Sequence, residues 1–217
     1  MRRIIIDTDT ASDDAVAIIM ALREPEVQVE AITVVAGNLP IELAVKNALI
    51  SVEKAGASQP PVYKGMARPL LRALFTSEFV HGPNGMGGMD LPEPALRPAD
   101  EHAVDAMIRI IEANPHQLEL IALGPLTNIA MVCLKAPETI RKLKRITIMG
   151  SAGLGQGKIT PVAEFNIYLD AEAMQIVLDS GVPILLVGWD ACLGSAFLDQ
   201  QDILRLERSD SDIAQFC

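Results

Sequence analysis

The stretch Ile4-Ile5-Ile6-Asp7-Thr8-Asp9-Thr10-Ala11-Ser12-Asp13-Asp14 decides the fold class of this 217-residue chain. Three consecutive isoleucines predict a buried strand over residues 3–6, and the apolar spacing that follows predicts a helix over residues 13–23. A buried strand that runs through a polar turn into a helix is typical of an α/β protein. The stretch also places four carboxylates within eight residues, at the point where the strand ends.

The same alternation of short apolar runs and helical patterns continues along the chain. It predicts strands over residues 27–35, 61–63, 118–123, 146–149 and 183–187, helices over 41–55, 101–113, 128–134 and 171–179, and a polar helical tail over 199–217. Residues 64–100 are rich in Gly and Pro and predict a long loop. We therefore expect one α/β domain over residues 1–217, with a mostly parallel, doubly wound (Rossmann-like) sheet and helices on both faces.

The composition limits the classes of partner. Eighteen Lys and Arg against 28 Asp and Glu give a net charge of −10, and no basic run interrupts it. This balance argues against nucleic acid and against a membrane surface as partners, and it fits a neutral small molecule or a cation. Three cysteines follow no paired or zinc-binding spacing, and the first predicted strand leaves no room for a signal peptide. We expect a cytoplasmic protein with reduced thiols.

The acidic cluster has two interpretations. Asp13 and Asp14 could simply complement a helix dipole beside an N-cap at Ser12. That interpretation does not account for Asp7 and Asp9 at the end of a buried strand, because two carboxylates about 6 Å apart repel by roughly 2–3 kcal/mol. Protons or a cation must offset such repulsion. Since the candidate ligands are all oxygens, the cluster predicts a Ca²⁺ or Mg²⁺ site and not a Zn²⁺ site.

Other predicted strands also end in polar residues, and ligands of parallel sheets bind beyond the carboxyl ends of the strands. Asn38 follows the second strand, Asn128 closes the segment after the fourth, and Glu164 and Asn166 follow the glycine-rich segment after the fifth. Turn or cap chemistry is the alternative for the two asparagines Asn38 and Asn128. Glu164 and Asn166 are two residues apart, so an extended segment would point both to the same side.

Taken together, these motifs resemble the inosine–uridine-preferring nucleoside hydrolases. The resemblance is carried by Asp7-Thr8-Asp9, Asp13-Asp14-Ala15, Gly37-Asn38, Leu123-Gly124-Pro125-Leu126-Thr127-Asn128, and Ala163-Glu164-Phe165-Asn166-Ile167 with Asp170. It implies an enzyme that cleaves the N-glycosidic bond of ribonucleosides to ribose and free base, with Ca²⁺ as cofactor, in purine and pyrimidine salvage. It also implies a homo-oligomer, either a dimer or a tetramer.

The resemblance further implies a role for individual residues. Asp9 and both oxygens of Asp14 would bind Ca²⁺ with the backbone carbonyl of Leu123, and Asp9 would be the general base for a metal-bound water. Asp7 would support these ligands from behind. The residues implied to bind the substrate are Asp13 and Asn38 for the ribose hydroxyls, Glu164 and Asn166 for the 3′ and 5′ side, Met149 near the sugar, and His81 in a mobile loop over the site.

The sequence departs from the family's pattern in three places. Thr10-Ala11 replaces the usual Pro-Gly, and Lys158 stands where the family places an asparagine near the 5′-hydroxyl. Members of the family also continue beyond the position of Cys217, where they supply a further aspartate ligand and usually a histidine near the leaving base. Neither has a counterpart here, so we expect a chain that is incomplete at its C-terminal end relative to the family.

Two other functions stay open at this point. A haloacid-dehalogenase-like phosphatase also places Asp-x-Asp after its first strand and uses Mg²⁺, but it needs Thr or Val where this chain has Ala11, and a later Gly-Asp pair that is missing. A truncated, non-catalytic relative that binds calcium or ribose is the second alternative. Whether the substrate is a purine or a pyrimidine nucleoside cannot be read from these residues.

Overall fold

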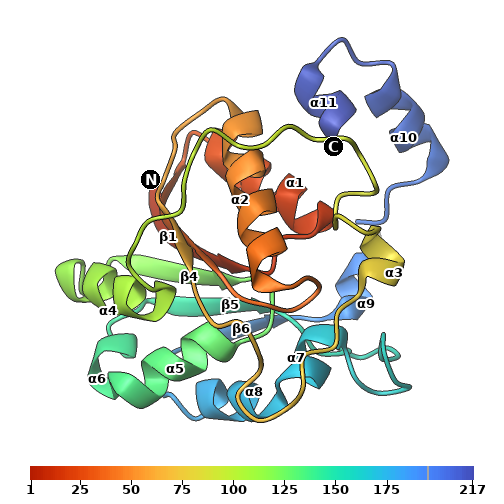
Figure 1. Ribbon diagram of the computed structural model, residues 1–217. Helices are drawn as coiled ribbons and strands as arrows, with labels where there is room; N and C mark the ends of the chain where they lie inside the picture. Colours follow the sequence, from red (N-terminus) through yellow and green to blue (C-terminus); the bar gives the residue numbers. More distant parts are fainter. Residues whose placement is uncertain (195) are drawn as a thin grey trace.

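The computed structural model describes residues 1–194 and 196–217 and contains a six-stranded sheet in which each pair of neighbouring strands is parallel. The strands are β1 (Arg2–Thr8), β2 (Val27–Val34), β3 (Val62–Lys64), β4 (Leu118–Ala122), β5 (Arg145–Met149) and β6 (Ile184–Val187). Their order across the sheet is β3-β2-β1-β4-β5-β6 (Figure 1). This is the strand order of a doubly wound Rossmann-like sheet, as the sequence predicts.

Helices cover both faces of the sheet. The helices are α1 (Ser12–Arg23), α2 (Ile41–Ala55), α3 (Glu78–His81), α4 (Ala103–Ala113), α5 (Thr127–Lys135), α6 (Pro137–Ile140), α7 (Phe165–Leu169), α8 (Ala171–Leu178), α9 (Trp189–Cys192), α10 (Gln200–Glu207) and α11 (Asp212–Phe216). Helices α1 and α2 lie on one face, and α4, α5, α6 and α8 lie on the other (Figure 1). No helix in residues 1–194 or 196–217 is both long enough and apolar enough to cross a membrane.

Strand β1 shows why the sheet needs a helical layer on each side. Ile4 and Ile6 belong to the core cluster beneath α1 and α2, whereas Ile5 belongs to the cluster beneath α4 and α5. Successive side chains of a strand point to opposite faces, so three consecutive isoleucines bury apolar surface on both. All three are at most 5% exposed.

Several predicted boundaries agree with the structure and others do not. Helix α2 spans residues 41–55 as predicted. Ser12 is not an N-cap, because α1 begins at Ser12 itself and Ala11 precedes it without a side-chain cap. The predicted tail over 199–217 is two helices, α10 and α11, each with its own capping side chain.

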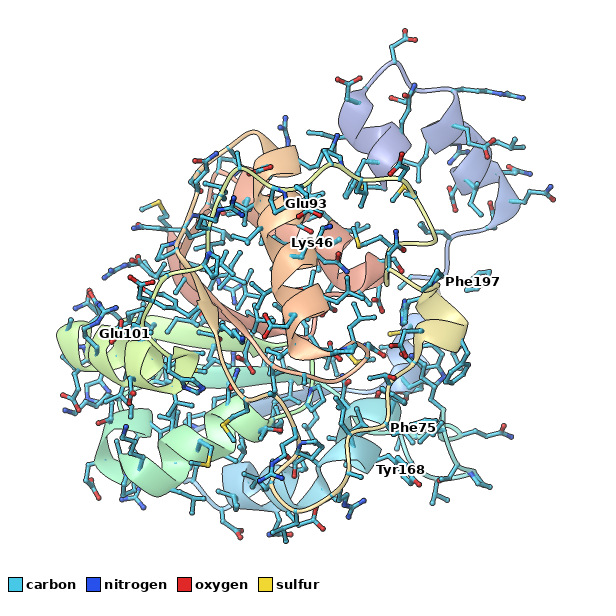
Figure 2. The ribbon with its side chains drawn as sticks, in the orientation of Figure 1. Lys46, Phe75, Glu93, Glu101, Tyr168 and Phe197 are labelled. Carbon is cyan, nitrogen blue, oxygen red and sulfur yellow. The ribbon has the colours of Figure 1, made fainter. Side chains whose placement is uncertain are left out.

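The segment over residues 64–100, predicted as a long loop, makes contacts with the rest of the domain at several points. It contains the four-residue helix α3, and a bridge pairs Tyr63 with Ala99. Its later part runs across α2, where Lys46 forms an ion pair with Glu93 (Figure 2) and Glu53 accepts the backbone N–H of Leu96. The segment therefore forms part of the cover over the α2 face.

The carboxyl ends of β1 and β4 lie side by side at the centre of the sheet. The chain leaves β1 towards α1 on one face and leaves β4 towards α5 on the opposite face (Figure 1). Connections that diverge in this way open a crevice between two neighbouring strands. The sequence segments that follow β1 and β4 are those that carry the acidic cluster and Leu123.

Candidate active site

Most of the predicted site residues line one cavity of about 290 Å³ at this edge of the sheet. Those lining it are Asp13, Asp14, Asn38, Leu123, Met149, Glu164 and Asn166. They come from the segments that follow β1, β2, β4 and β5, which the sheet order brings together. His81 lines a smaller neighbouring cavity of about 70 Å³ that shares the wall formed by Asn38, Lys158 and Phe165.

Asp9 is fully buried at the end of β1 and is closely surrounded. Its Oδ2 accepts the backbone N–H of Asn38, while none of the described residues donates to its Oδ1. Two glycines make room for this carboxylate: a Cβ on Gly124 would lie 2.9 Å from Oδ1, and a Cβ on Gly37 would overlap Oδ2. Burial raises the pKa of Asp9 to about 6. A buried carboxylate oxygen without a donor is costly, and such an oxygen is suited to a cation.

Asp14 is held by a chain of hydroxyl groups. Its Oδ2 accepts a hydrogen bond from the hydroxyl of Thr8 at 2.5 Å, and that hydroxyl lies 3.0 Å from the hydroxyl of Thr10. Burial raises the pKa of Asp14, and the charges of Asp9 and Asp13 raise it further. Thr10 therefore has a structural role in the turn where the family pattern has a proline.

Asp7, like Asp9, is fully buried, and neither of the two is among the residues that line the cavity. The Oδ1 of Asp7 accepts the hydroxyl of Thr33 at 2.6 Å and the amide of Asn128 at 2.9 Å, and burial raises the pKa of Asp7 to about 7. Asn128 also donates to the carbonyl of Val34 at 3.0 Å. Asn128 lies inside α5, which has no side-chain cap, so its amide links distant segments and does not provide the turn or cap chemistry considered as its alternative.

The prediction for Glu164 and Asn166 is wrong in its geometry, because the segment is not extended. Glu164 is the N-cap of α7, and its carboxylate accepts the backbone N–H groups of Asn166 at 3.0 Å and Ile167 at 3.2 Å. Both residues still line the cavity. The Asn166 amide donates to the carbonyl of Leu123 at 2.7 Å and lies 3.3 Å from that of Met149, so it joins the ends of β4 and β5.

His81 ends the short helix α3 and is buried. Its Nδ1 lies 3.0 Å from the hydroxyl of Ser12, and its Nε2 is buried with no partner among the described residues. Burial lowers the pKa of His81 and favours the neutral ring. The structure therefore places His81 at the end of a short helix, within hydrogen-bond distance of Ser12 at the start of α1, where the sequence suggested a loop.

Trp189 and Cys192 are among the cavity residues that the sequence analysis missed. Both belong to α9, directly after β6, and line the cavity beside Lys158. The rule that ligands bind beyond strand ends could have identified them, because the strand over 183–187 was predicted. They were missed because no motif marks this segment.

The fit of a metal ion depends on the donor atoms. Within residues 1–194 and 196–217, no three His, Cys, Asp or Glu side chains are grouped closely enough to form a metal site by themselves. A metal ion would therefore need oxygen atoms of other kinds as well. The available oxygens are the unpartnered Oδ1 of Asp9, the carboxylate of Asp14 and the Leu123 carbonyl, which has a second lone pair. Two carboxylates and a carbonyl suit a hard cation such as Ca²⁺.

Comparison with known proteins gives consistent results. Residues 4–217 match the family described as inosine-uridine preferring nucleoside hydrolase. The pyrimidine-specific ribonucleoside hydrolase of Salmonella arizonae is 43% identical over 86% of this chain and 60% of its own length. A solved plant nucleoside hydrolase matches with a TM-score of 0.94 at 36% identity, over 99% of this chain and 68% of that chain. A solved purine-preferring ribonucleoside hydrolase from Gardnerella vaginalis matches with a TM-score of 0.93 at 32% identity, over 99% of this chain and 69% of that chain.

Proposed function

The chain belongs to the inosine-uridine preferring nucleoside hydrolase family, and from this premise we propose that it hydrolyses the N-glycosidic bond of ribonucleosides with Ca²⁺ as cofactor. The chain spans about 60% of the length of the curated relatives that it matches, so the activity is proposed for the chain as given. The observation that carries the proposal is the buried, unpartnered Asp9 Oδ1, beside a cavity lined by Asp13, Asp14 and Asn38. The products, ribose and a free base, would enter nucleoside catabolism and salvage.

We assign the metal to three groups. Asp9, Asp14 and the backbone carbonyl of Leu123 would hold Ca²⁺, which when bound would acidify a water molecule and order the ribose diol. Asp7 supports this arrangement from behind, because Thr33 and Asn128 fix one of its oxygens. Fully oxygen-based ligation agrees with the absence of Cys and His from the acidic stretch.

The residues of the chain account for the remaining steps. Asp9 accepts the proton of the attacking water at Oδ1 while the water oxygen forms a bond to C1′ of ribose. The bond between C1′ and the base nitrogen breaks, and its electron pair leaves with the base, which takes up a proton. Positive charge develops on the ribose ring in such a reaction, and the carboxylates of Asp13 and Glu164 in the cavity wall would stabilise it.

Substrate contacts follow from the cavity wall. Asp13 and Asn38 would hold hydroxyls on the β1 and β2 side, and Glu164 and Asn166 would hold the opposite side of the sugar. Met149 would pack against the ring, and His81 would lie beside the base. A cytoplasmic location and a homo-oligomeric state, dimer or tetramer, are part of the same proposal.

The test is release of free base from a panel of purine and pyrimidine ribonucleosides, with Ca²⁺ and then with excess chelator. We expect release that the chelator abolishes, and an Asp9→Ala variant that folds but releases no base. Release that persists in the chelator, or in the Asp9→Ala variant, would contradict the mechanism.

Calorimetric titration with ribose distinguishes the non-catalytic alternative. Ribose binding without base release from any nucleoside would favour a binding protein over an enzyme. The phosphatase alternative has no support from the family match, and absence of phosphate release from nucleotides would remove it.

A further inference from the structure

The cavity wall combines carboxylates with an ammonium group. It includes Asp13, Asp14 and Glu164, and within residues 1–194 and 196–217 Lys158 is the only Lys or Arg that lines it. Lys158 also lines the adjoining cavity next to His81. Lys158 is exposed, so its ammonium group is open to solvent, and three carboxylates in the same cavity wall are candidate partners for it.

Lys158, like Lys54 and Lys144, forms no ion pair within residues 1–194 and 196–217, whereas Lys46, Lys64, Lys135 and Lys142 do. Glu164, in the same cavity wall, is a carboxylate with which Lys158 could form an ion pair. That carboxylate, however, is the N-cap of α7 and accepts two backbone N–H groups. The ammonium of Lys158 instead lies over the ring of Trp189, 4.5 Å from its centroid. A ring holds a cation in place and leaves its hydrogen-bond donors available for another partner.

The backbone around Lys158 is also fixed. The N–H groups of Lys158 and Ile159 both donate to the carbonyl of Ala163, at 2.8 and 3.0 Å, and the N–H of Gly157 donates to the carbonyl of Pro161 at 2.9 Å. Gly157 has no room for a Cβ, because one would overlap backbone atoms of Thr160 and Ala163. The turn therefore holds Lys158 at a set position next to Glu164.

The sheet places Lys158 across the cavity from the acidic cluster. Asp13 and Asp14 follow β1, whereas Lys158 and Trp189 follow β5 and β6, with β4 in between. Strands two apart in a sheet are separated by about 10 Å, which is enough to hold a sugar ring between them. A ribose whose 2′,3′-diol is held near β1 would direct its exocyclic 5′ carbon towards Lys158.

We propose that Lys158, seated on Trp189, is a specificity-determining residue that binds an anionic group on the 5′ carbon of the sugar, so that the favoured substrate is a ribonucleoside 5′-phosphate. This inference rests on the proposed function for the orientation of the ribose. We take the anion to be a phosphate monoester, because this is the anionic group found on the 5′ carbon of nucleotides. Lys158 supplies a point charge with three donors, which suits a phosphate.

Binding of ribose 5-phosphate tests the inference without requiring turnover. Titration calorimetry with Ca²⁺ should give a Kd for ribose 5-phosphate at least tenfold below that for ribose. Lys158→Gln should remove this difference, Lys158→Arg should keep most of it, and Lys144→Gln, at an exposed lysine, should leave it unchanged. Base release from a nucleoside and from its 5′-monophosphate should show the same preference in kcat/KM.

Several results would overturn the inference. One is that ribose and ribose 5-phosphate bind equally well, or that neither binds. Another is that Lys158→Gln keeps the preference for ribose 5-phosphate. A third is that inorganic phosphate binds as tightly as ribose 5-phosphate. A loss of binding in Lys158→Gln that is equal for both sugars would show a purely structural role and would overturn it too. If ribose 5-phosphate is preferred but no base is released from any nucleoside or nucleotide, the proposed function fails while the assignment of Lys158 stands.

Discussion

Asp9 is subject to two opposing requirements. Its proposed role needs a carboxylate oxygen free to hold a cation and to accept a proton, whereas stability favours a buried oxygen that has a donor. The surrounding residues do not supply that donor to Oδ1, and burial raises the pKa of Asp9 to about 6. Gly37 and Gly124 keep the space around the carboxylate open. The residue is arranged for function at a cost to the stability of the metal-free chain.

We predict that Asp9→Asn stabilises the metal-free protein and abolishes its activity. The amide is neutral, keeps an oxygen for the N–H of Asn38, and can donate towards Asp14, whose carboxylate lies close enough for the charge of Asp9 to raise its pKa. The expected gain is about 1–2 kcal/mol in the free energy of unfolding, the cost of one unsatisfied buried group. Urea denaturation in chelator measures the gain, and base release measures the loss.

The comparison variant for this prediction is Asp179→Asn, which changes the same side chain at an exposed position, the C-cap of α8. It should change the free energy of unfolding by no more than about 0.5 kcal/mol, and it should leave the activity unchanged. A metal-free Asp9→Asn protein that is less stable than the wild type would contradict the electrostatic interpretation of the site.

Sequence reasoning at the residue scale succeeded where spacing carries chemistry. Four carboxylates at the end of a strand are improbable by packing alone, so Asp13 and Asp14 could be placed at the cavity before any coordinates. Trp189 was not placed there, because the strand-end rule alone does not separate a single aromatic residue that packs from one that contacts a ligand. The proposed role of Lys158 in binding an anion depends on the position of its ammonium group over the Trp189 ring, which only the three-dimensional arrangement shows.

At the scale of single elements, helix length determined what could be predicted. Helix α2 has 15 residues, enough for a clear 3.6-residue period, and its predicted bounds were correct. Helix α7 has only five residues, less than two turns, and its start depends on the N-cap Glu164. So short a segment carries no periodic signal, which is why it was predicted as extended.

One carboxylate fastens three neighbouring strands together. Glu119 on β4 pairs with Arg2 on β1 and with Arg145 on β5, each with a shortest N–O distance of 2.7 Å. Hydrogen bonds from Arg2 and Arg145 outweigh burial and hold the pKa of Glu119 below its ordinary value. A lowered pKa in the folded state stabilises the protein above the ordinary carboxyl pKa, about 4.3, and this stabilisation is lost as the pH falls through the folded value.

We predict that Glu119→Gln lowers the free energy of unfolding by about 1 kcal/mol at pH 7, because two ion pairs are removed at a site where the carboxylate is only 14% exposed. The difference from the wild type should shrink as the pH falls below about 4 and vanish once Glu119 is protonated. Urea denaturation between pH 3 and 7 measures it. Glu138→Gln, which removes an exposed ion pair with Arg141, should change stability much less, and an equal effect would contradict the prediction.

At the scale of the whole molecule, the order of strands makes the site. Residues that are far apart in the sequence, from Asp13 to Asn166, meet because β1 and β4 are neighbours with connections on opposite faces. The alternation of strands and helices predicted a parallel sheet, and the general rule for such sheets predicted the edge where the ligand binds. The order of the strands was not predicted, because hydrophobic patterns identify strands without specifying their neighbours.

That arrangement would make the proposed metal binding a property of the folded chain alone. Asp9 follows β1, Asp14 lies in α1 and the Leu123 carbonyl follows β4, so unfolding separates the three proposed ligands. A ligand that binds only the folded state stabilises it by about 2.7 kcal/mol at a hundredfold excess over its Kd. We predict that Ca²⁺ raises the urea midpoint without changing the slope, that chelator reverses this, and that Mg²⁺ gives a smaller shift because it requires tighter octahedral geometry. Asp14→Asn should abolish the shift, and a full shift in that variant would place the calcium elsewhere on the molecule.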